Sequence, residues 1–323
     1  SSSRLLLAIP VYLFIRRVGI NINAVFVGSI LGAIVAGGYS FYQHEYLNLT
    51  MSTGAANNHI FFGQVALILT MFSFCSAVVS KKTINTLLSL VAALCGLYAV
   101  IVSGSRGGWL AIPVIFLFLF SANVWHISKL KIVIVTTLLL VTSIGVYNID
   151  KLPVKSRVDR VFTEVDLYFT KDHVDSSVGS RFEMWKGALL IAKDSYFLGV
   201  GEVGYSSARQ QLIDDNRVHK KIYHFDPHNM YLNTLAKQGV FGLIALLLIM
   251  LIPLRKFYKD AITNSASKNT SIMGAILVIA YMDFMLTTST FIYQYMVVFF
   301  IFILVALLGN LTHKKNLKKS LFS

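Results

Sequence analysis

The chain has 323 residues, of which 55% are hydrophobic and 14% are charged, and its formal net charge is +14. With a mean hydropathy of +0.66, this composition excludes an ordinary soluble domain. The positive charge does not indicate a nucleic-acid partner, because the cations fall in alternate short loops between apolar runs. The sequence therefore predicts an all-α polytopic integral membrane protein.

Apolar runs of about 20 residues, the length that a helix needs to cross the hydrocarbon core, recur along the chain. They cover residues 22–42, 60–79, 84–104, 108–123, 130–148, 240–257, 271–288 and 291–309, with a shorter run at about 5–18. We therefore expect about nine crossings and one long helical interruption. The expected parts are an N-terminal bundle of about six spans at 1–148, a loop at 149–239, and C-terminal spans with a basic tail at 240–323.

Basic residues mark every second short loop and predict the orientation of the chain. By the positive-inside rule these loops are cytoplasmic, so the long loop lies on the far side of the membrane. This orientation leaves Ser1 outside the cytoplasm, which predicts an odd number of further spans upstream if the full protein begins in the cytoplasm. The basic residues are Arg16, Arg17, Lys81, Lys82, Lys129, Lys131, Arg255, Lys256, Lys259, Lys268, Lys314, Lys315, Lys318 and Lys319.

The first polar region on the predicted outer side is the turn at residues 103–109, with the sequence SGSRGGW. Ser105 is a plausible N-cap, which would place Arg106 in the first turn of the span that begins near residue 107. The neighbouring glycines would let a ligand approach the backbone closely. Taken alone, the turn is also compatible with an arginine that anchors the membrane edge.

The second polar region lies in the long loop, around Arg181. Ser180 and Glu183 have the spacing of a capping box, which predicts that a helix starts there and stops before the turn-rich Gly199. Arg181 would then occupy the first helical position, where a cation is unfavourable unless an anion is bound. The alternative is a surface arginine that pairs with Glu183 or Asp175.

The third polar region is the segment Asp226-Pro227-His228-Asn229, just before the chain re-enters the membrane. It predicts a helix with Asp226 as N-cap and Pro227 as its first residue, ending at Gly239. The positive potential of that helix start should lower the pKa of His228, which would keep the imidazole neutral and able to accept a proton. The alternative is a structural histidine beside a membrane.

Arg106, Arg181 and His228 are thus all predicted in first helical turns on one side of the membrane. Two guanidinium groups and helix N-termini suit a phosphate or diphosphate. We expect arginine to neutralise this ligand without a metal ion, because the sequence offers no acidic cluster and both Cys75 and Cys95 lie within spans.

Asp283 lies in the span 271–288, toward its predicted outer end. An acid inside a membrane span is a functional hypothesis by default. Two interpretations remain open for it. Asp283 either holds an arginine of the site or forms a packing hydrogen bond with Thr287, Thr288 or Tyr281.

The order His228-Asn229, nine residues, then Gly239-x-x-Gly242 resembles the signature of the O-antigen ligase family. That family joins lipopolysaccharide O-antigen ligases with O-antigen polymerases and bacterial protein O-oligosaccharyltransferases. The turn at Arg106 and the Gly-Ser-Arg that ends at Arg181 look like the paired arginines of the family. The resemblance covers the chain from about residue 22 onward. Members carry about twelve bilayer-length spans, which implies about three before residue 1.

The resemblance implies a multi-pass glycosyltransferase of the bacterial inner membrane, with its active site on the periplasmic side. It would transfer O-antigen glycan from undecaprenyl diphosphate to the lipid A–core oligosaccharide, without a cofactor. With the residues above, we expect inversion at the sugar, with His228 as general base and with Arg106 and Arg181 on the diphosphate. The expected supporting residues are Asp226, Asn229, Gly239, Gly242 and Asp283.

Two alternatives stay open. An O-antigen polymerase or a protein O-oligosaccharyltransferase would use the same donor and chemistry. A lipid-linked oligosaccharide transporter is the rival of another class. It should show internal repeats and several charges deep in the bundle, whereas here only Asp283 qualifies and the polar residues gather on one predicted face.

Overall fold

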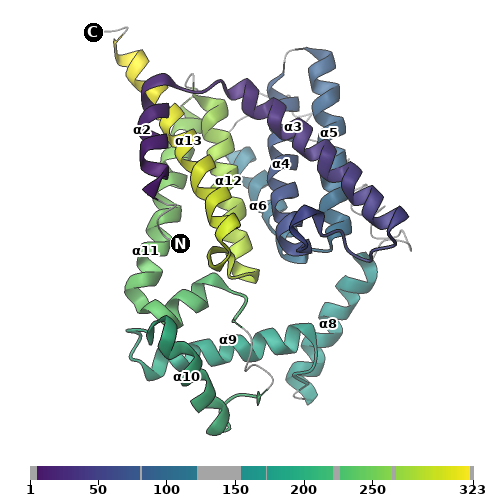
Figure 1. Ribbon diagram of the computed structural model, residues 1–323, viewed down its shortest axis with the longest axis vertical. Helices are drawn as coiled ribbons and strands as arrows, with labels where there is room; N and C mark the ends of the chain where they lie inside the picture. The colour runs from purple at the N-terminus through teal and green to yellow at the C-terminus, as the bar shows by residue number, and fades with distance from the viewer. Residues whose placement is uncertain are drawn as a thin grey trace. The chain divides into compact units, whose positions relative to one another are not determined.

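The computed structural model describes residues 6–80, 82–121, 154–171, 173–220, 226–263 and 267–320 (Figure 1). Every regular element in these ranges is helical, and six of the helices are long and apolar enough to cross a membrane. The predicted class, an all-α polytopic membrane protein, is therefore confirmed. The predicted span at 130–148 lies outside the described residues.

The six membrane-spanning helices match six of the predicted apolar runs. They are α3 (Ile22–Phe41, continued by η1 at Tyr42–Tyr46), α4 (His59–Val79), α5 (Thr83–Ser103), α11 (Met230–Ile262), α12 (Lys268–Thr287) and α13 (Gln294–Ser320). The shorter helices α2 (Ala8–Val18) and α6 (Ala111–Ser121) take the places of the predicted runs at 5–18 and 108–123. The long interruption is helical as expected, with α8 (Val154–Lys171), α9 (Ser177–Asp194) and α10 (Gly201–Asp214).

The chain divides into two compact units. The first, here called the membrane unit, consists of residues 1–126, 250–284 and 293–323. The second, here called the loop unit, consists of residues 127–249 and 285–292. This division follows packing. The predicted division at 148 and 239 follows the side of the membrane, and it stays a prediction.

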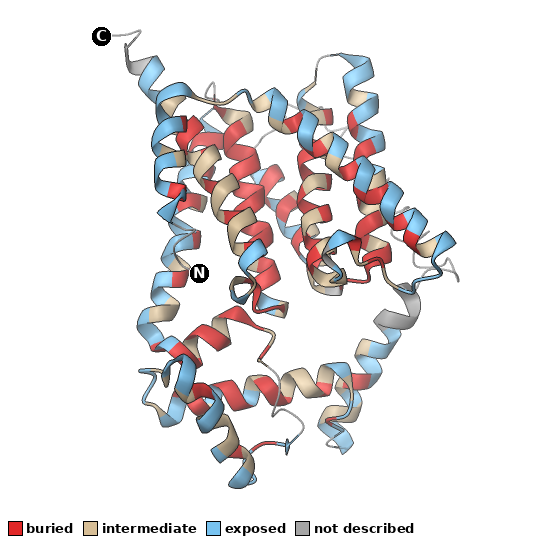
Figure 2. Cartoon of the chain, viewed as in Figure 1, coloured by how far each residue is buried: buried red, intermediate tan, exposed pale blue. Residues whose placement is uncertain are grey.

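In the membrane unit, α4 packs against α5, α3 packs against both, and α2 packs against α13. Small residues allow the close approaches: a Cβ added to Gly37 would lie 2.6 Å from the carbonyl oxygen of Cys95, and one added to Gly96 would lie 2.3 Å from Oγ1 of Thr70. Figure 2 shows α12 as the most thoroughly buried helix, with 83% of its apolar window covered by the protein. This helix carries Asp283.

The basic helix ends of the membrane unit gather at one end of it. Successive helices run in alternate directions (Figure 1), so the end of α2, the start of α5, the end of α11, the start of α12 and the end of α13 come together. Arg106 and Asp283 lie at the opposite helix ends. The basic residues described there are Arg16, Arg17, Lys82, Arg255, Lys256, Lys259, Lys268, Lys314 and Lys315.

The loop unit has a small core of its own, formed by α9, α10 and the first segment of α11. Helix α8 packs on α9, and Oε2 of Glu164 accepts the backbone N–H of Val178 at 2.9 Å. The core residues are Met184, Ala188, Ile191, Tyr205, Leu212, Val218 and Ala236. This core supports the segment that contains the histidine.

Candidate functional site

The turn at His228 differs from the predicted helix start. Helix α11 begins at Met230, and His228 precedes it in the left-handed region, with φ +46°. Its backbone N–H donates to Oδ1 of Asp226 at 2.7 Å, whereas Oδ1 of Asn229 accepts the N–H of Leu232 at 3.1 Å. The prediction of Asp226 as N-cap and of Pro227 and His228 within the helix is therefore wrong. Asn229 caps the helix, and the Asp226 carboxylate instead stabilises the turn that precedes it.

Three further hydrogen bonds hold this turn in place. The hydroxyl of Ser289 donates to Oδ1 of Asp226 at 2.9 Å, and Nδ2 of Asn229 donates to the carbonyl of Leu286 at 3.1 Å. The indole N–H of Trp185, on α9, donates to the carbonyl of Pro227 at 2.8 Å. Sequence reasoning missed Ser289 and Leu286 entirely and treated Trp185 as helix body, because no local pattern links positions so far apart.

The environment of His228 favours its neutral form. Burial is the main cause that lowers the pKa of the imidazole, Arg181 lowers it further, and the carboxylate of Asp226 opposes both. The predicted direction is thus confirmed, although burial replaces the helix start as its main cause. Nδ1 of His228 lies 3.7 Å from Oδ1 of Asp226, so the two groups form an ion pair when the ring is protonated.

Two substitutions should move the pKa of His228 in opposite directions. Arg181→Gln removes a cation that disfavours the imidazolium, so the pKa should rise. Asp226→Asn removes the carboxylate but keeps an oxygen for the N–H of His228, so the pKa should fall. NMR titration of the ring in detergent measures both. Lys193→Gln, on the exposed side of α9, is the matched control, and shifts of equal sign would contradict this account.

Helix α9 starts earlier than the capping-box pattern predicts. Its N-cap is Ser176, whose side-chain oxygen accepts the N–H of Gly179 at 2.9 Å. A Cβ on Gly179 would lie 2.4 Å from the carbonyl oxygen of His173, so this close approach seats the first turn. The predicted box of Ser180 and Glu183 is wrong, and Arg181 lies in the second turn, where the dipole argument for an anion no longer applies.

Glu183 joins three elements of the loop unit in place of capping α9. Its carboxylate is buried and accepts from the hydroxyl of Tyr168 at 3.1 Å and from the backbone N–H of His219 at 2.9 Å. The Nζ of Lys186 lies 3.2 Å from it. This network fixes α9 and therefore the helix that carries Arg181.

The turn at Arg106 also departs from the prediction. Residues Arg106–Trp109 form a 3₁₀ helix, and α6 begins only at Ala111. The side chain of Ser105 makes no capping hydrogen bond; its backbone carbonyl accepts the N–H of Gly108 at 3.2 Å. Ser105 is therefore not the predicted side-chain cap. The tight turn satisfies the backbone by itself.

Asp283 is buried beside this turn, within the membrane unit. Its carboxylate accepts a hydrogen bond from the backbone N–H of Ala111, and its Oδ2 has no hydrogen-bond partner among the described residues. The hydroxyl of Tyr281, one of the three packing partners considered for Asp283, donates to the carbonyl of Met296 at 2.9 Å.

Gly239 interrupts α11 as predicted, with φ +68° and ψ −167°. The loop that precedes α10 packs against this break: the N–H of Val240 donates to the carbonyl of Phe197 at 2.8 Å, and the N–H of Val200 donates to that of Ala236 at 3.1 Å. A Cβ on Gly199 would lie 2.4 Å from the nitrogen of Gly239. The two glycines therefore meet backbone to backbone, a contact that sequence reasoning missed.

Gly242 lies just beyond the break, on the second segment of α11. A Cβ on it would lie 2.3 Å from Cβ of Gln238, so this glycine makes room where the helix changes direction. Both glycines of the predicted Gly-x-x-Gly pattern thus have a steric function at the break.

The loop unit contains most of the predicted site residues, namely Arg181, Asp226, His228, Asn229, Gly239 and Gly242. Arg106 and Asp283 belong to the membrane unit, so the convergence of Arg106 on the histidine stays a prediction. Among the described residues, no group of three or more His, Cys, Asp or Glu side chains is placed to hold a metal ion.

Comparison with known proteins adds a family and a relative. A family model described as O-antigen ligase matches residues 91–247, which include Arg106, Arg181 and His228. A Haemophilus influenzae protein, itself described only as uncharacterized, is 28% identical over 298 residues, which are 90% of this chain and 73% of that protein.

Proposed function

The chain belongs to the O-antigen ligase family, whose model matches residues 91–247, and on that premise we propose that it is an O-antigen ligase. It transfers O-antigen glycan from undecaprenyl diphosphate to a hydroxyl of the lipid A–core oligosaccharide, on the periplasmic side of the bacterial inner membrane. The observation that carries the proposal is His228, partly buried, with its pKa held low and Arg181 close enough to act on it.

In the proposed reaction, His228 takes the proton from the acceptor hydroxyl. The freed oxygen attacks C1 of the donor sugar on the face opposite the diphosphate, and the bond from C1 to the diphosphate oxygen breaks with inversion. Undecaprenyl diphosphate leaves with the electron pair. A positioned general base contributes roughly 10²–10⁴-fold to such a rate.

The geometry around His228 supports the direction of this proton transfer. Nδ1 faces the carboxylate of Asp226 at 3.7 Å, so we assign Nε2 as the atom that takes the proton. Asp226 then stabilises the imidazolium, and Ser289 and the turn keep that carboxylate oriented. A carboxylate beside the ring nitrogen that does not take the proton orients a catalytic histidine and stabilises its protonated form.

The two arginines are assigned to the diphosphate. A guanidinium can donate to two phosphate oxygens at once, and it stabilises the charge that develops as the diphosphate leaves. Arg181 is supported by its electrostatic effect on His228. For Arg106, support comes from its place within residues 91–247, which the family model matches.

A transfer assay with competing acceptors tests the proposal. The purified chain receives labelled undecaprenyl-diphosphate glycan in the presence of EDTA, with lipid A–core, lipid-linked repeat units and a pilin-like protein offered together. We expect label on lipid A–core, with inverted anomeric configuration, and no loss of rate from EDTA. Label on longer lipid-linked glycans would indicate a polymerase, and label on the protein an oligosaccharyltransferase. Movement of the donor across a vesicle membrane without transfer of its glycan would indicate a transporter.

A further inference from the structure

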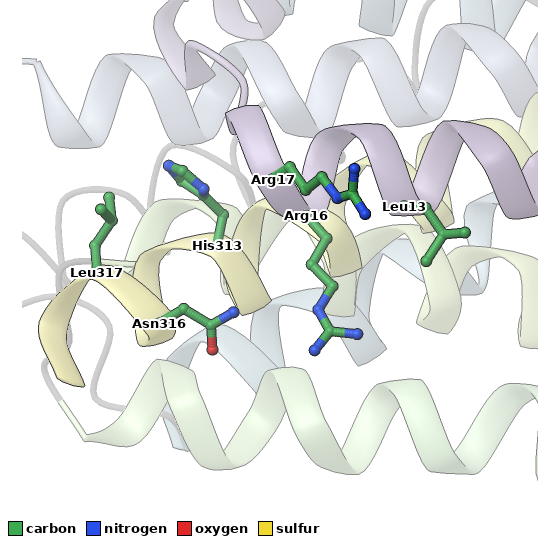
Figure 3. A pocket seen from close by; sticks show the side chains of 6 residues that line it. All are labelled: Leu13, Arg16, Arg17, His313, Asn316 and Leu317. Carbon is green, nitrogen blue, oxygen red and sulfur yellow. The ribbon is translucent and has the colours of Figure 1, made fainter. Parts of the chain in front are cut away.

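The basic end of the membrane unit contains a groove over the junction of α2 and α13 (Figure 3). Its volume is about 620 Å³, within the range of small-molecule sites. Figure 3 shows Arg16 and Asn316 extending from the two helices toward the same space. Among the described residues, no acidic side chain lines it. The lining residues are Leu13, Arg16, Arg17, His313, Asn316 and Leu317.

The walls of the groove are held by contacts between the α2–α3 turn and α13. Gly19 has φ +77°, and a Cβ on it would lie 2.6 Å from the ring of His313, so this ring packs directly on the turn. The N–H of Ile20 donates to Oδ1 of Asn310 at 3.1 Å. Asn310 is 1% exposed and donates to Oγ1 of Thr270 on α12 at 2.9 Å. The groove is therefore preformed.

The cations of the groove are not neutralised by the acid described at this end of the membrane unit. Asp260, the one acid among the described residues at this end, is 4% exposed. Its carboxylate contacts Nζ of Lys315 at 2.9 Å and accepts from the hydroxyls of Ser267 at 2.6 Å and Ser271 at 2.8 Å. The groove therefore presents an excess of positive charge that an anion would complement.

An apolar track leads along α2 to the two arginines. Ile9 and Leu13 are four residues apart, and Arg16 and Arg17 follow three and four residues after Leu13, so all four share one face of the helix. Ile9 and Leu13 are exposed in the protein. A ligand that fits this face has an apolar tail and an anionic head, and a free phosphate would leave the apolar part unused.

We propose that this groove binds the phosphodiester of an anionic phospholipid. The guanidinium groups of Arg16 and Arg17 bind the phosphate oxygens, Asn316 and His313 complete the rim, and an acyl chain lies along Leu13 and Ile9. Basic pockets between membrane helices are known to take such head groups. The site is independent of the proposed glycan transfer.

Native mass spectrometry of the full chain in detergent tests the site. Phosphatidylglycerol is the probe, phosphatidylcholine is the zwitterionic comparison, and inorganic phosphate is the soluble competitor. Arg16→Gln with Arg17→Gln should weaken phosphatidylglycerol binding about 30-fold. The matched control is Lys82→Gln with Lys259→Gln, which removes the same charge from exposed positions at the same end outside the groove and should change binding little.

Four results would overturn the proposal. They are equal binding of the two lipids by the unchanged chain, an equal loss in the control pair, displacement of the lipid by inorganic phosphate, and a lysine pair at Arg16 and Arg17 that binds no better than the glutamine pair. Displacement would assign the groove to a free phosphate. Thermal unfolding in detergent without added lipid verifies that each variant is folded, so a loss of binding reports on the groove.

Discussion

Replacement of His228 by asparagine is expected to reduce glycan transfer by roughly 10²–10⁴-fold, because it removes the proposed general base. Asparagine suits the site as a test residue, since it tolerates the left-handed backbone that His228 adopts at φ +46°. The backbone N–H that bonds Asp226 is retained. Single-turnover transfer measures the loss, and donor binding, measured separately, should persist.

The pH profile makes this prediction sharper. Burial and Arg181 keep the pKa of His228 below the ordinary 6.5, so the base is neutral at pH 7. The rate of transfer should be constant near neutral pH and fall only below pH 6.5, where the imidazole becomes protonated. The matched control is His219→Gln, an exposed histidine of the same unit that should leave rate and profile unchanged. Transfer by His228→Asn above a tenth of the normal rate would exclude His228 as the general base.

Gly239→Ala is expected to destabilise the loop unit severely. At φ +68° and ψ −167° the backbone lies in a region that essentially only glycine adopts, which costs alanine about 1–3 kcal/mol, and the Cβ of alanine would lie 2.4 Å from the carbonyl carbon and oxygen of Leu198. These are backbone atoms, so no rotamer relieves the clash. Displacement of the loop would also lose the bonds from Val240 to Phe197 and from Val200 to Ala236, each worth about 0.5–1.5 kcal/mol. The sum of the backbone strain and the two lost hydrogen bonds is about 2–6 kcal/mol.

Gly204→Ala is the matched control for this substitution. Gly204 lies within α10 with ordinary helical backbone, and a Cβ on it would meet Val200 at 3.4 Å, an ordinary contact. Alanine there should be neutral or stabilising by about 0.5–1 kcal/mol. Thermal unfolding in detergent compares the two variants. A Gly239→Ala protein that unfolds at the same temperature as the unchanged chain would show that the break in α11 tolerates a side chain.

Sequence alone determined the features that depend on local composition. Six apolar runs became membrane-spanning helices, because a run of that length has no other way to satisfy its backbone in a bilayer. Gly239 ended the first segment of α11 as predicted, because only glycine adopts its backbone angles without strain. The alternating cations predicted that the basic helix ends of the membrane unit lie together, as Figure 1 shows.

Tertiary structure decided which of several possible residues caps each helix and which distant residues bond to the turn at His228. Several residues before α9 and α11 can act as caps, and packing selected Ser176 and Asn229 over Ser180 and Asp226. The turn at His228 is bonded to Trp185 on α9, to Leu286 in the last turn of α12 and to Ser289 just after that helix. Burial, the main cause of the low pKa of His228, is a property of the folded chain. A local pattern specifies which backbone groups need partners, but only the packed fold determines which partners they find.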